Sequence, residues 1–201
     1  MNPELKILDS IPMTEEAYFQ LEADSGIRHE YIDGQTYAMV GSALNHNRIA
    51  MNVAVGFSNH LRGTSCETFS ADMKVQIGND YVYPDVVVDC HATGNLLVSP
   101  VIIVEVLSKS TRKKDTTQKL IRYINLPSLQ EYVLIEQDIV SVQVLRRTNA
   151  WQPEYYYLGD SVTFDAIGVT LTVDNIYDRV DNAEPNEFRQ LQQGVVVKNS
   201  E

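Results

Sequence analysis

The sequence predicts an α/β or α+β fold with a mixed β-sheet, and three observations predict it. Pro100–Leu107 is the most apolar run of the chain, which is typical of a central strand buried on both faces. A helical segment follows and ends before Pro127, and Glu131–Ile135 is another apolar strand, so the helix predicts a parallel crossover. Met73–Ile77 alternates with period two, as a half-buried strand does. A chain of 201 residues is typical of a single domain, so residues 1–201 are expected to form one.

The N-terminal part predicts a helix followed by a β-hairpin. Thr14 and the two acidic residues after it indicate a capped helix start, and the helix is expected to reach about Ala23. The dipeptide Asp33-Gly34 is a strong signal for a two-residue hairpin turn, because both positions favour positive φ. Glu30 lies inside the first strand of this hairpin, where the simplest interpretation is an edge-strand acid that faces water.

A second helix is predicted over Leu44–Leu61, with apolar residues at every fourth position on one face: Ile49, Val53, Phe57 and Leu61. His46 falls in its first turn, where a histidine is more often a surface or capping residue than a ligand. This helix is expected to pack on the sheet through its apolar face.

Strands are predicted on both sides of the crossover. Those before the central strand are 64–69, 73–77 and 81–88, with a bulge or bend at 70–72, and those after the crossover are 139–146, 151–158, 162–164 and 169–173. The latter form a C-terminal meander around a core of about residues 26–136. From Asp181 the chain turns polar, and residues 182–201 are expected to be a flexible or partner-docking tail.

Composition narrows the function classes. The net charge of −11 argues against a non-specific nucleic-acid coat, which relies on Lys and Arg to neutralise phosphates. A local basic cluster is nevertheless present, made of Lys109, Arg112, Lys113, Lys114 and Lys119. It is equally compatible with a binding patch and with a solvated loop and helix start. No apolar run approaches the ~20 residues of a membrane helix, and the N-terminus lacks signal-peptide features, so a cytoplasmic protein is expected.

The two cysteines, Cys66 and Cys90, lie on two strands that are expected to be neighbours. Because the cytosol is reducing, we expect them to be small buried residues without a disulfide bond. The four histidines show no Cys/His spacing of a zinc site.

Two carboxylates interrupt apolar strands. Asp85 follows Pro84, and Glu105 follows four β-branched residues. Burying an unpaired carboxylate costs several kcal/mol, so each is expected to have a partner, and two on neighbouring strands indicate a shared divalent cation, Mg²⁺ or Mn²⁺. Phosphoryl chemistry also needs a nearby cation, for which Lys119 and Lys109 are candidates. The alternative for Lys119 is an ordinary surface pair with Asp115, four residues away.

Four segments carry a resemblance to a known family: RHEYIDG (28–34), SADMKV (70–75), YPDVVV (83–88) and VEVLSKST (104–111). Together they resemble the Uma-type restriction endonuclease family of the PD-(D/E)XK nuclease superfamily, over about residues 14–178. The resemblance implies a restriction-endonuclease-like αβββαβ core, which agrees with the element order above. It also implies metal-dependent hydrolysis of DNA.

Site roles follow from this resemblance residue by residue. Asp85 and Glu105 would be metal ligands, with the backbone carbonyl of Val106 completing the shell. Leu107 stands where the superfamily expects lysine, and Lys119 matches the lysine of the family's following helix. Less specific matches are Glu30 and Asp72 as ligands or orienting groups, and His46 with no stated role. Lys109 is not part of the resemblance and stays the alternative cation to Lys119.

Two functions remain open on these grounds. One is a Mg²⁺- or Mn²⁺-dependent endodeoxyribonuclease, expected to act on DNA as a homodimer through Val195–Val197 or the C-terminal sheet. The other is a nuclease-fold protein that binds a protein or nucleic-acid partner without cutting, which the acidic balance favours. A metal-dependent phosphodiesterase acting on RNA is a third option.

Overall fold

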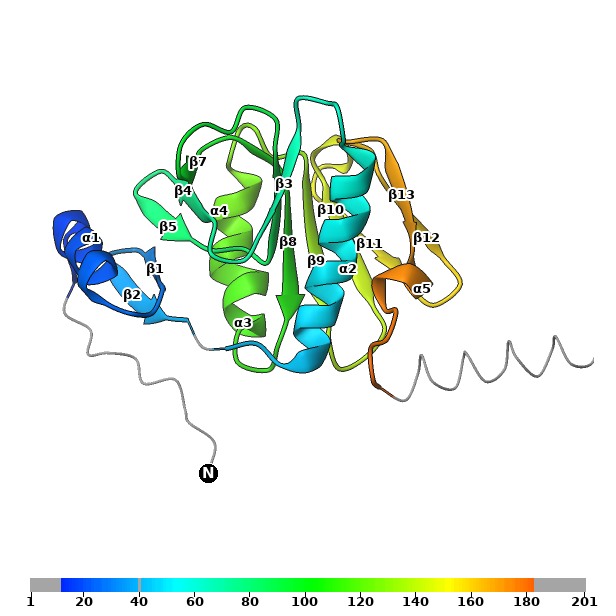
Figure 1. Cartoon of the computed structure of the whole chain (residues 1–201), viewed down its shortest axis with the longest axis horizontal. Coiled ribbons are helices and arrows are strands. Elements are labelled where there is room, and N and C mark those ends of the chain that lie inside the picture. Colours follow the sequence, from blue (N-terminus) through cyan, green and yellow to red (C-terminus); the bar gives the residue numbers. More distant parts are fainter. Residues whose placement is uncertain (1–11, 40, 183–201) are drawn as a thin grey trace, which may run out of the picture.

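The structure is a computed structural model of the chain, and it describes residues 12–39 and 41–182. A six-stranded sheet forms its centre (Figure 1). Its strand order is β11-β10-β9-β8-β6-β3, made of β3 (Glu67–Ser70), β6 (Val86–Asp89), β8 (Pro100–Leu107), β9 (Glu131–Glu136), β10 (Val142–Arg146) and β11 (Pro153–Tyr156). Only β8 and β9 pair in parallel within this sheet, so the predicted central strand and the parallel crossover are confirmed.

A second, five-stranded sheet lies beside the first. Its order is β2-β1-β5-β4-β7, made of β1 (His29–Ile32), β2 (Gln35–Ala38), β4 (Lys74–Ile77), β5 (Asp80–Val82) and β7 (Leu96–Leu97). The single strand expected over 81–88 is therefore wrong, because β5 and β6 belong to different sheets. Pro84 stands at the break, and a proline has no N–H to donate in the interior of a ladder. The chain thus leaves one sheet and enters the other directly before Asp85.

The helices connect and cover these sheets. They are α1 (Glu15–Asp24), α2 (Leu44–His60), a continuous helix made of α3 (Arg112–Lys114), the π-helical η1 (Asp115–Lys119) and α4 (Leu120–Ile124), the 3₁₀ turn η2 (Arg147–Asn149) and α5 (Val173–Ile176). The Thr14 side chain accepts a hydrogen bond from the Ala17 N–H, as the predicted N-cap requires. None of the helices in the described residues is long and apolar enough to cross a membrane.

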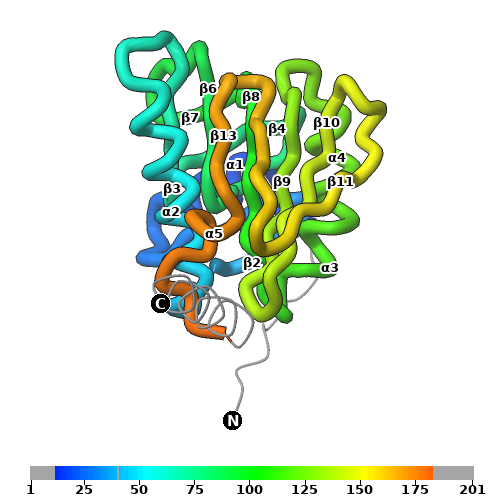
Figure 2. Tube along the Cα trace, turned by 90° about the vertical axis from the view of Figure 1, so that its right-hand side faces the viewer, coloured from blue at the N-terminus to red at the C-terminus, as the bar shows by residue number. Residues whose placement is uncertain are grey.

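The six-stranded sheet is covered on both faces. On one face α2, α5 and the hairpin β12 (Ser161–Phe164)–β13 (Val169–Thr172) pack against alternate strand residues such as Val86, Val104 and Val133. On the other face the second sheet and the helix before β9 pack against Val87, Ile103 and Leu134. Figure 2 shows the hairpin in front of the sheet and α4 behind it. Since side chains alternate along a strand, Glu105 shares the second face with Ile103.

Two loop predictions are met by the backbone. Asp33 and Gly34 have φ of 52° and 74°, as the hairpin turn requires. Ala71 and Asp72, in the predicted bend, have φ of 41° and 56° and carry the chain out of β3 beside Asp85. The expected tail over 182–201 and the expected contact at Val195–Val197 lie outside the described residues, apart from Asn182.

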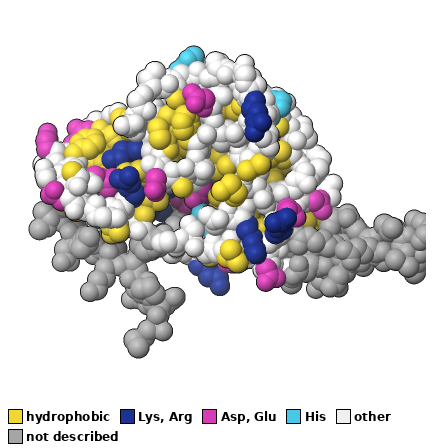
Figure 3. Space-filling model, viewed as in Figure 1, with side chains coloured by type: hydrophobic (Ala, Val, Ile, Leu, Met, Phe, Trp, Pro, Cys, Tyr) yellow, Lys and Arg dark blue, Asp and Glu magenta, His cyan; other side chains and the backbone are white. Residues whose placement is uncertain are grey.

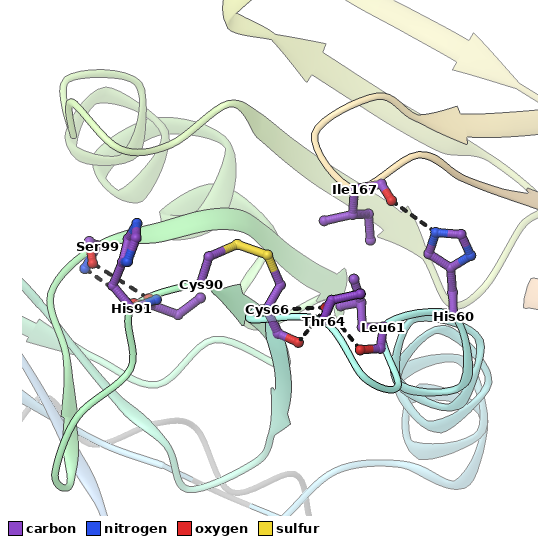
Figure 4. Close-up of a disulfide and its surroundings, with 9 residues drawn as sticks. His60, Leu61, Thr64, Cys66, Cys90, His91, Ser99 and Ile167 are labelled. Carbon is purple, nitrogen blue, oxygen red and sulfur yellow. Dashed lines mark hydrogen bonds between the residues drawn. A yellow bond between two sulfur atoms is a disulfide. The ribbon is translucent and has the colours of Figure 1, made fainter.

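The expectation of unpaired cysteines is wrong. Cys66 and Cys90 form a disulfide that joins the start of β3 to the end of β6 (Figure 4). The β3–β6 register explains it, because Glu67 lies opposite Asp89 and the next pair outward is Cys66 with Cys90. Both cysteines are half-buried at the rim of the core, and the bond fixes the edge strand to its neighbour.

Candidate active site

A pocket of about 320 Å³ lies between the two sheets and the helix that follows β8. It brings together six of the residues singled out in the sequence: Glu30, His46, Asp85, Glu105, Val106 and Lys119. In the space-filling view the surface is hollowed between the part that carries the five-stranded sheet and the part that carries the six-stranded sheet, and acidic side chains and a histidine are visible there (Figure 3). Segments far apart in the sequence therefore build one site.

Glu105 forms the floor of this pocket. Its side chain leaves β8 toward α4, and the residue is only 4% exposed. The carboxylate Oε1 accepts hydrogen bonds from Lys119 Nζ at 2.9 Å and from the Tyr123 hydroxyl at 2.8 Å. Burial raises the pKa of Glu105 well above the ordinary carboxyl value; Lys119 opposes the rise, and three neighbouring carboxylates add to it.

Lys119 is buried beside Glu105, so the interpretation as a surface pair with Asp115 is wrong. Its Nζ lies 2.6 Å from Glu30 Oε1, 2.9 Å from Glu105 Oε1 and 3.3 Å from Asp115 Oδ1. The π-helical turn η1 begins at Asp115 and ends at Lys119, and both residues are buried. Burial lowers the pKa of the ammonium, but the charges of Glu105 and Glu30 outweigh it and hold the pKa well above its ordinary value. Lys119 is thus a fixed positive charge.

Glu30 does not face water as expected from its strand. The pairing of β1 with both β2 and β5 makes β1 an interior strand, and Glu30 is 6% exposed. Its Oε2 lies 3.2 Å from Lys114 Nζ, and that ammonium lies 3.9 Å from the centre of the Tyr37 ring. Burial alone would raise the pKa of Glu30, but Lys119 and Lys114 outweigh it and lower the pKa. The N-terminal hairpin therefore holds two lysines of the α3–η1 helix.

Asp85 lies directly before β6, on the more open side of the pocket. Its Oδ2 accepts a hydrogen bond of 2.7 Å from the Val106 N–H and lies 3.3 Å from His46 Nε2. Burial lowers the pKa of His46, but the hydrogen bond and charge of Asp85, with a backbone hydrogen bond to Val106, raise it overall. His46 therefore orients Asp85, a role that its position in a helix turn did not predict.

The remaining candidates lie outside this cluster. Asp72 is exposed and lines an adjoining cavity of about 570 Å³, which shares Asp85 and Tyr83 with the pocket. Lys109 is exposed and is not among the residues that line the pocket. The structure therefore separates these two residues from the buried carboxylates.

The donor set determines which cation the pocket suits. Within residues 12–39 and 41–182, no group of three or more His, Cys, Asp and Glu side chains is arranged to hold a metal ion. The pocket is lined by Asp85, Glu105 and Val106, which offer two carboxylates and a backbone carbonyl. One or two carboxylates suffice for Mg²⁺, because waters and substrate phosphate complete its shell. The residues therefore fit Mg²⁺ or Mn²⁺ as a partial, all-oxygen shell.

Three residues of the site were not predicted as site residues. They are Tyr123, Asp115, which was expected only as a surface partner of Lys119, and Lys114, which was expected only as a member of the basic cluster. The four-residue spacing of Asp115 and Lys119 was a signal for their contact, although not for their burial. The sequence contains no comparable signal for the Tyr123 hydrogen bond, which depends on how the helix packs on β8.

Comparisons with known proteins find sequences similar to this chain. The Uma2 family model, described as "Putative restriction endonuclease", matches residues 15–174. Two proteins of Synechocystis sp. (strain ATCC 27184 / PCC 6803 / Kazusa) are similar in sequence. "Uncharacterized protein slr1290" is 35% identical over 82% of this chain and 91% of its own, and "Uncharacterized protein sll1609" is 34% identical over 62% and 75%.

A solved structure shares the fold. It is described as "a putative nuclease belonging to DUF820" from Anabaena variabilis ATCC 29413, and it aligns with a TM-score of 0.71 at 16% identity. The alignment covers 83% of this chain and 98% of the other. The nuclease-like fold expected from the sequence is thereby confirmed.

Proposed function

Because the chain belongs to the Uma2 family of restriction-endonuclease-like proteins, we propose that it is a Mg²⁺- or Mn²⁺-dependent endodeoxyribonuclease that hydrolyses phosphodiester bonds of DNA. One observation carries the proposal: Asp85, directly before β6, and Glu105, on the neighbouring strand β8, line the same pocket as a buried lysine, Lys119. This set is suited to phosphoryl transfer, where positioning and charge stabilisation do most of the work.

Each residue has a distinct task in this proposal. Asp85, Glu105 and the Val106 carbonyl would hold the divalent ion, which supplies Lewis-acid polarisation of a phosphoryl oxygen and a more acidic bound water. Lys119 remains charged and stabilises the negative charge that develops on the phosphate. His46 and the Val106 N–H fix the orientation of the Asp85 carboxylate. A homodimer would offer two such sites to the two strands of a duplex.

One observation favours a second function, a non-cleaving interaction module. Both carboxylates already have partners within the protein, since Lys119 and Tyr123 contact Glu105 while His46 and the Val106 N–H contact Asp85. With the net charge of −11, such a fold could bind a partner without cutting nucleic acid.

A plasmid-nicking assay separates the two functions. Supercoiled plasmid is incubated with the wild type and with Asp85→Ala, in Mg²⁺, Mn²⁺ or EDTA. The nuclease proposal expects nicking by the wild type in a divalent cation, none in EDTA, and a loss of at least about a hundredfold in the variant. Calorimetric titration with Mn²⁺ should show weaker binding to Asp85→Ala. A wild type that leaves the plasmid intact in both cations would support the interaction module instead.

A further inference from the structure

The two lysines held by Glu30 differ in how much of their charge is available. Lys119 contacts three carboxylates, and its side chain is 5% exposed. Lys114 contacts one carboxylate among the residues that the structure describes, and its side chain is 22% exposed at the pocket wall. Before a metal binds, three carboxylates offset much of the Lys119 charge, so the Lys114 charge at the pocket wall is the more available one for a ligand that enters the pocket.

Lys114 is also held in place. Its ammonium lies 3.2 Å from Glu30 Oε2 and 3.9 Å above the Tyr37 ring, and both residues come from the N-terminal hairpin. A cation over an aromatic face is attracted by the negative face of the ring. The flexible lysine chain is therefore pre-oriented toward the pocket, and the entropy lost on contact with a ligand is reduced.

The neighbouring cations lack this arrangement. Arg112 forms a bidentate ion pair with Glu136, outside the pocket. Lys113 is exposed and is not among the residues that line the pocket. Within the basic cluster 109–114, Lys114 is thus the member whose ammonium reaches the wall of the site.

We propose that Lys114 is a substrate-binding residue that contacts a non-bridging oxygen of a DNA phosphate in the pocket, while Lys119 acts as the internal charge of the site. This rests on the proposed nuclease function and assigns within it a second cation, held by Glu30 and Tyr37. An ammonium–phosphate contact of this kind releases condensed counterions, so its presence can be read from the salt dependence of binding.

The test measures binding and cleavage of a fluorescein-labelled DNA duplex by the wild type, Lys114→Ala and the matched control Lys113→Ala. Binding is followed by fluorescence anisotropy in Ca²⁺ over a range of KCl concentrations. Lys114→Ala should weaken binding by roughly tenfold or more and reduce the slope of log K against log[KCl] by about one. Cleavage in Mg²⁺ should show the loss mainly in KM. Lys113→Ala should change these values far less.

A second variant keeps the proposal testable if Lys114→Ala folds poorly. Tyr37→Leu keeps the charge of Lys114 but removes the ring that orients its ammonium. It should therefore weaken DNA binding without reducing the slope of log K against log[KCl]. A wild type that cleaves DNA, with Lys114→Ala and Lys113→Ala equal in affinity and slope, would overturn the role of Lys114 and leave the nuclease function standing. A wild type that neither binds nor cleaves DNA would remove the nuclease function, and the phosphate contact with it.

Discussion

Two buried charge clusters lie on the same six-stranded sheet, and they differ in what surrounds the cation. Lys119 is surrounded by three buried carboxylates, those of Glu30, Glu105 and Asp115. Arg146 on β10 also contacts three carboxylates, but only Glu131 on β9 is buried, whereas the side chains of Glu154 and Asp165 are 35% and 68% exposed. The central cation of each cluster is nearly inaccessible, at 4% exposed for Lys119 and 6% for Arg146. Burial raises the pKa of both Glu105 and Glu131, so the direction of the pKa shift does not separate the clusters.

Hydrogen-bond saturation does separate them. Glu131 Oε1 accepts from Arg146 Nε at 3.0 Å and from the Asp165 N–H at 3.1 Å, while its Oε2 accepts from the Ala166 N–H at 3.4 Å. Arg146 also donates to the Thr163 carbonyl at 2.7 Å. In the other cluster, three buried carboxylates share one buried ammonium, and among the described residues Asp115 Oδ1 has only its ion pair with Lys119 Nζ at 3.3 Å.

The difference indicates how to tell a structural cluster from a functional one. A cluster whose buried groups are saturated with hydrogen bonds links strands and leaves little capacity for a ligand. A cluster that borders a pocket with more buried carboxylates than cations carries excess negative charge, at a cost in stability that a cation or substrate can offset. By this criterion we propose that the Lys119 cluster is the functional one and that the Arg146 cluster holds the sheet together.

Removing each cation should give the largest effects and break the comparison most directly. Arg146→Met and Lys119→Met should each lower the free energy of unfolding by roughly 3–5 kcal/mol, because each leaves buried carboxylates uncompensated. DNA cleavage, measured at a temperature where both variants are folded, should fall by at least about a hundredfold in Lys119→Met and stay near wild type in Arg146→Met. Equal cleavage by the two variants would show that Lys119 is structural as well.

The sequence was informative where short-range chemistry determines structure. The Asp33-Gly34 turn depends on two adjacent φ angles, and the crossover between β8 and β9 depends on the order of apolar runs. The placement of Asp85 and Glu105 on one pocket followed from two acids in neighbouring apolar strands. These features need no knowledge of how distant segments pair.

The features that the sequence did not reveal depend on long-range pairing. Glu30 becomes buried because β5 pairs with β1. The residues of a strand do not by themselves determine which other strand it pairs with. The Cys66–Cys90 bond depends on the register of β3 with β6 in the same way. The π-helical turn that carries Lys119 has no sequence signature comparable to a cap or a proline.

Neutralising one carboxylate in each cluster should sharpen the comparison with an effect of intermediate size. Glu131→Gln replaces one carboxylate oxygen with an NH₂ group, which must then face a backbone N–H or the Arg146 guanidinium. The free energy of unfolding should therefore fall by about 1–3 kcal/mol. In Glu105→Gln the amide oxygen can still accept from Lys119 and Tyr123, so stability at neutral pH should be unchanged or rise by up to about 1 kcal/mol, while cleavage is lost.

The pH dependence gives the sign of the Glu105 effect. In the folded protein the pKa of Glu105 is raised above the ordinary value of 4.5, so protonated Glu105 stabilises the metal-free fold. This stabilisation is complete below pH 4.5 and is lost as the pH rises through the folded pKa. Glutamine does not titrate, so urea denaturation in EDTA should show the gap between Glu105→Gln and wild type growing in favour of the variant as pH rises. A gap that is constant with pH would show that Glu105 titrates normally.

Removing a single hydroxyl from the Lys119 cluster should give the smallest effect. The Tyr123 hydroxyl donates to Glu105 Oε1 at 2.8 Å, and a donor to the ionised form lowers a carboxyl pKa. Tyr123→Phe should therefore raise the pKa of Glu105 further and move the acid limb of the pH profile of cleavage to higher pH, by roughly half a unit to one unit for a contact of about 1 kcal/mol.

Tyr132→Phe is the matched control. Its ring lies 4.9 Å from that of Tyr123, and it loses a buried hydroxyl that donates to the Asp115 backbone carbonyl rather than to a carboxylate. Both variants should lose similar stability, but only Tyr123→Phe should shift the profile. A shift of equal size in both would mean that the hydroxyls act through packing of the helix, and that Glu105 is not tuned by a specific donor.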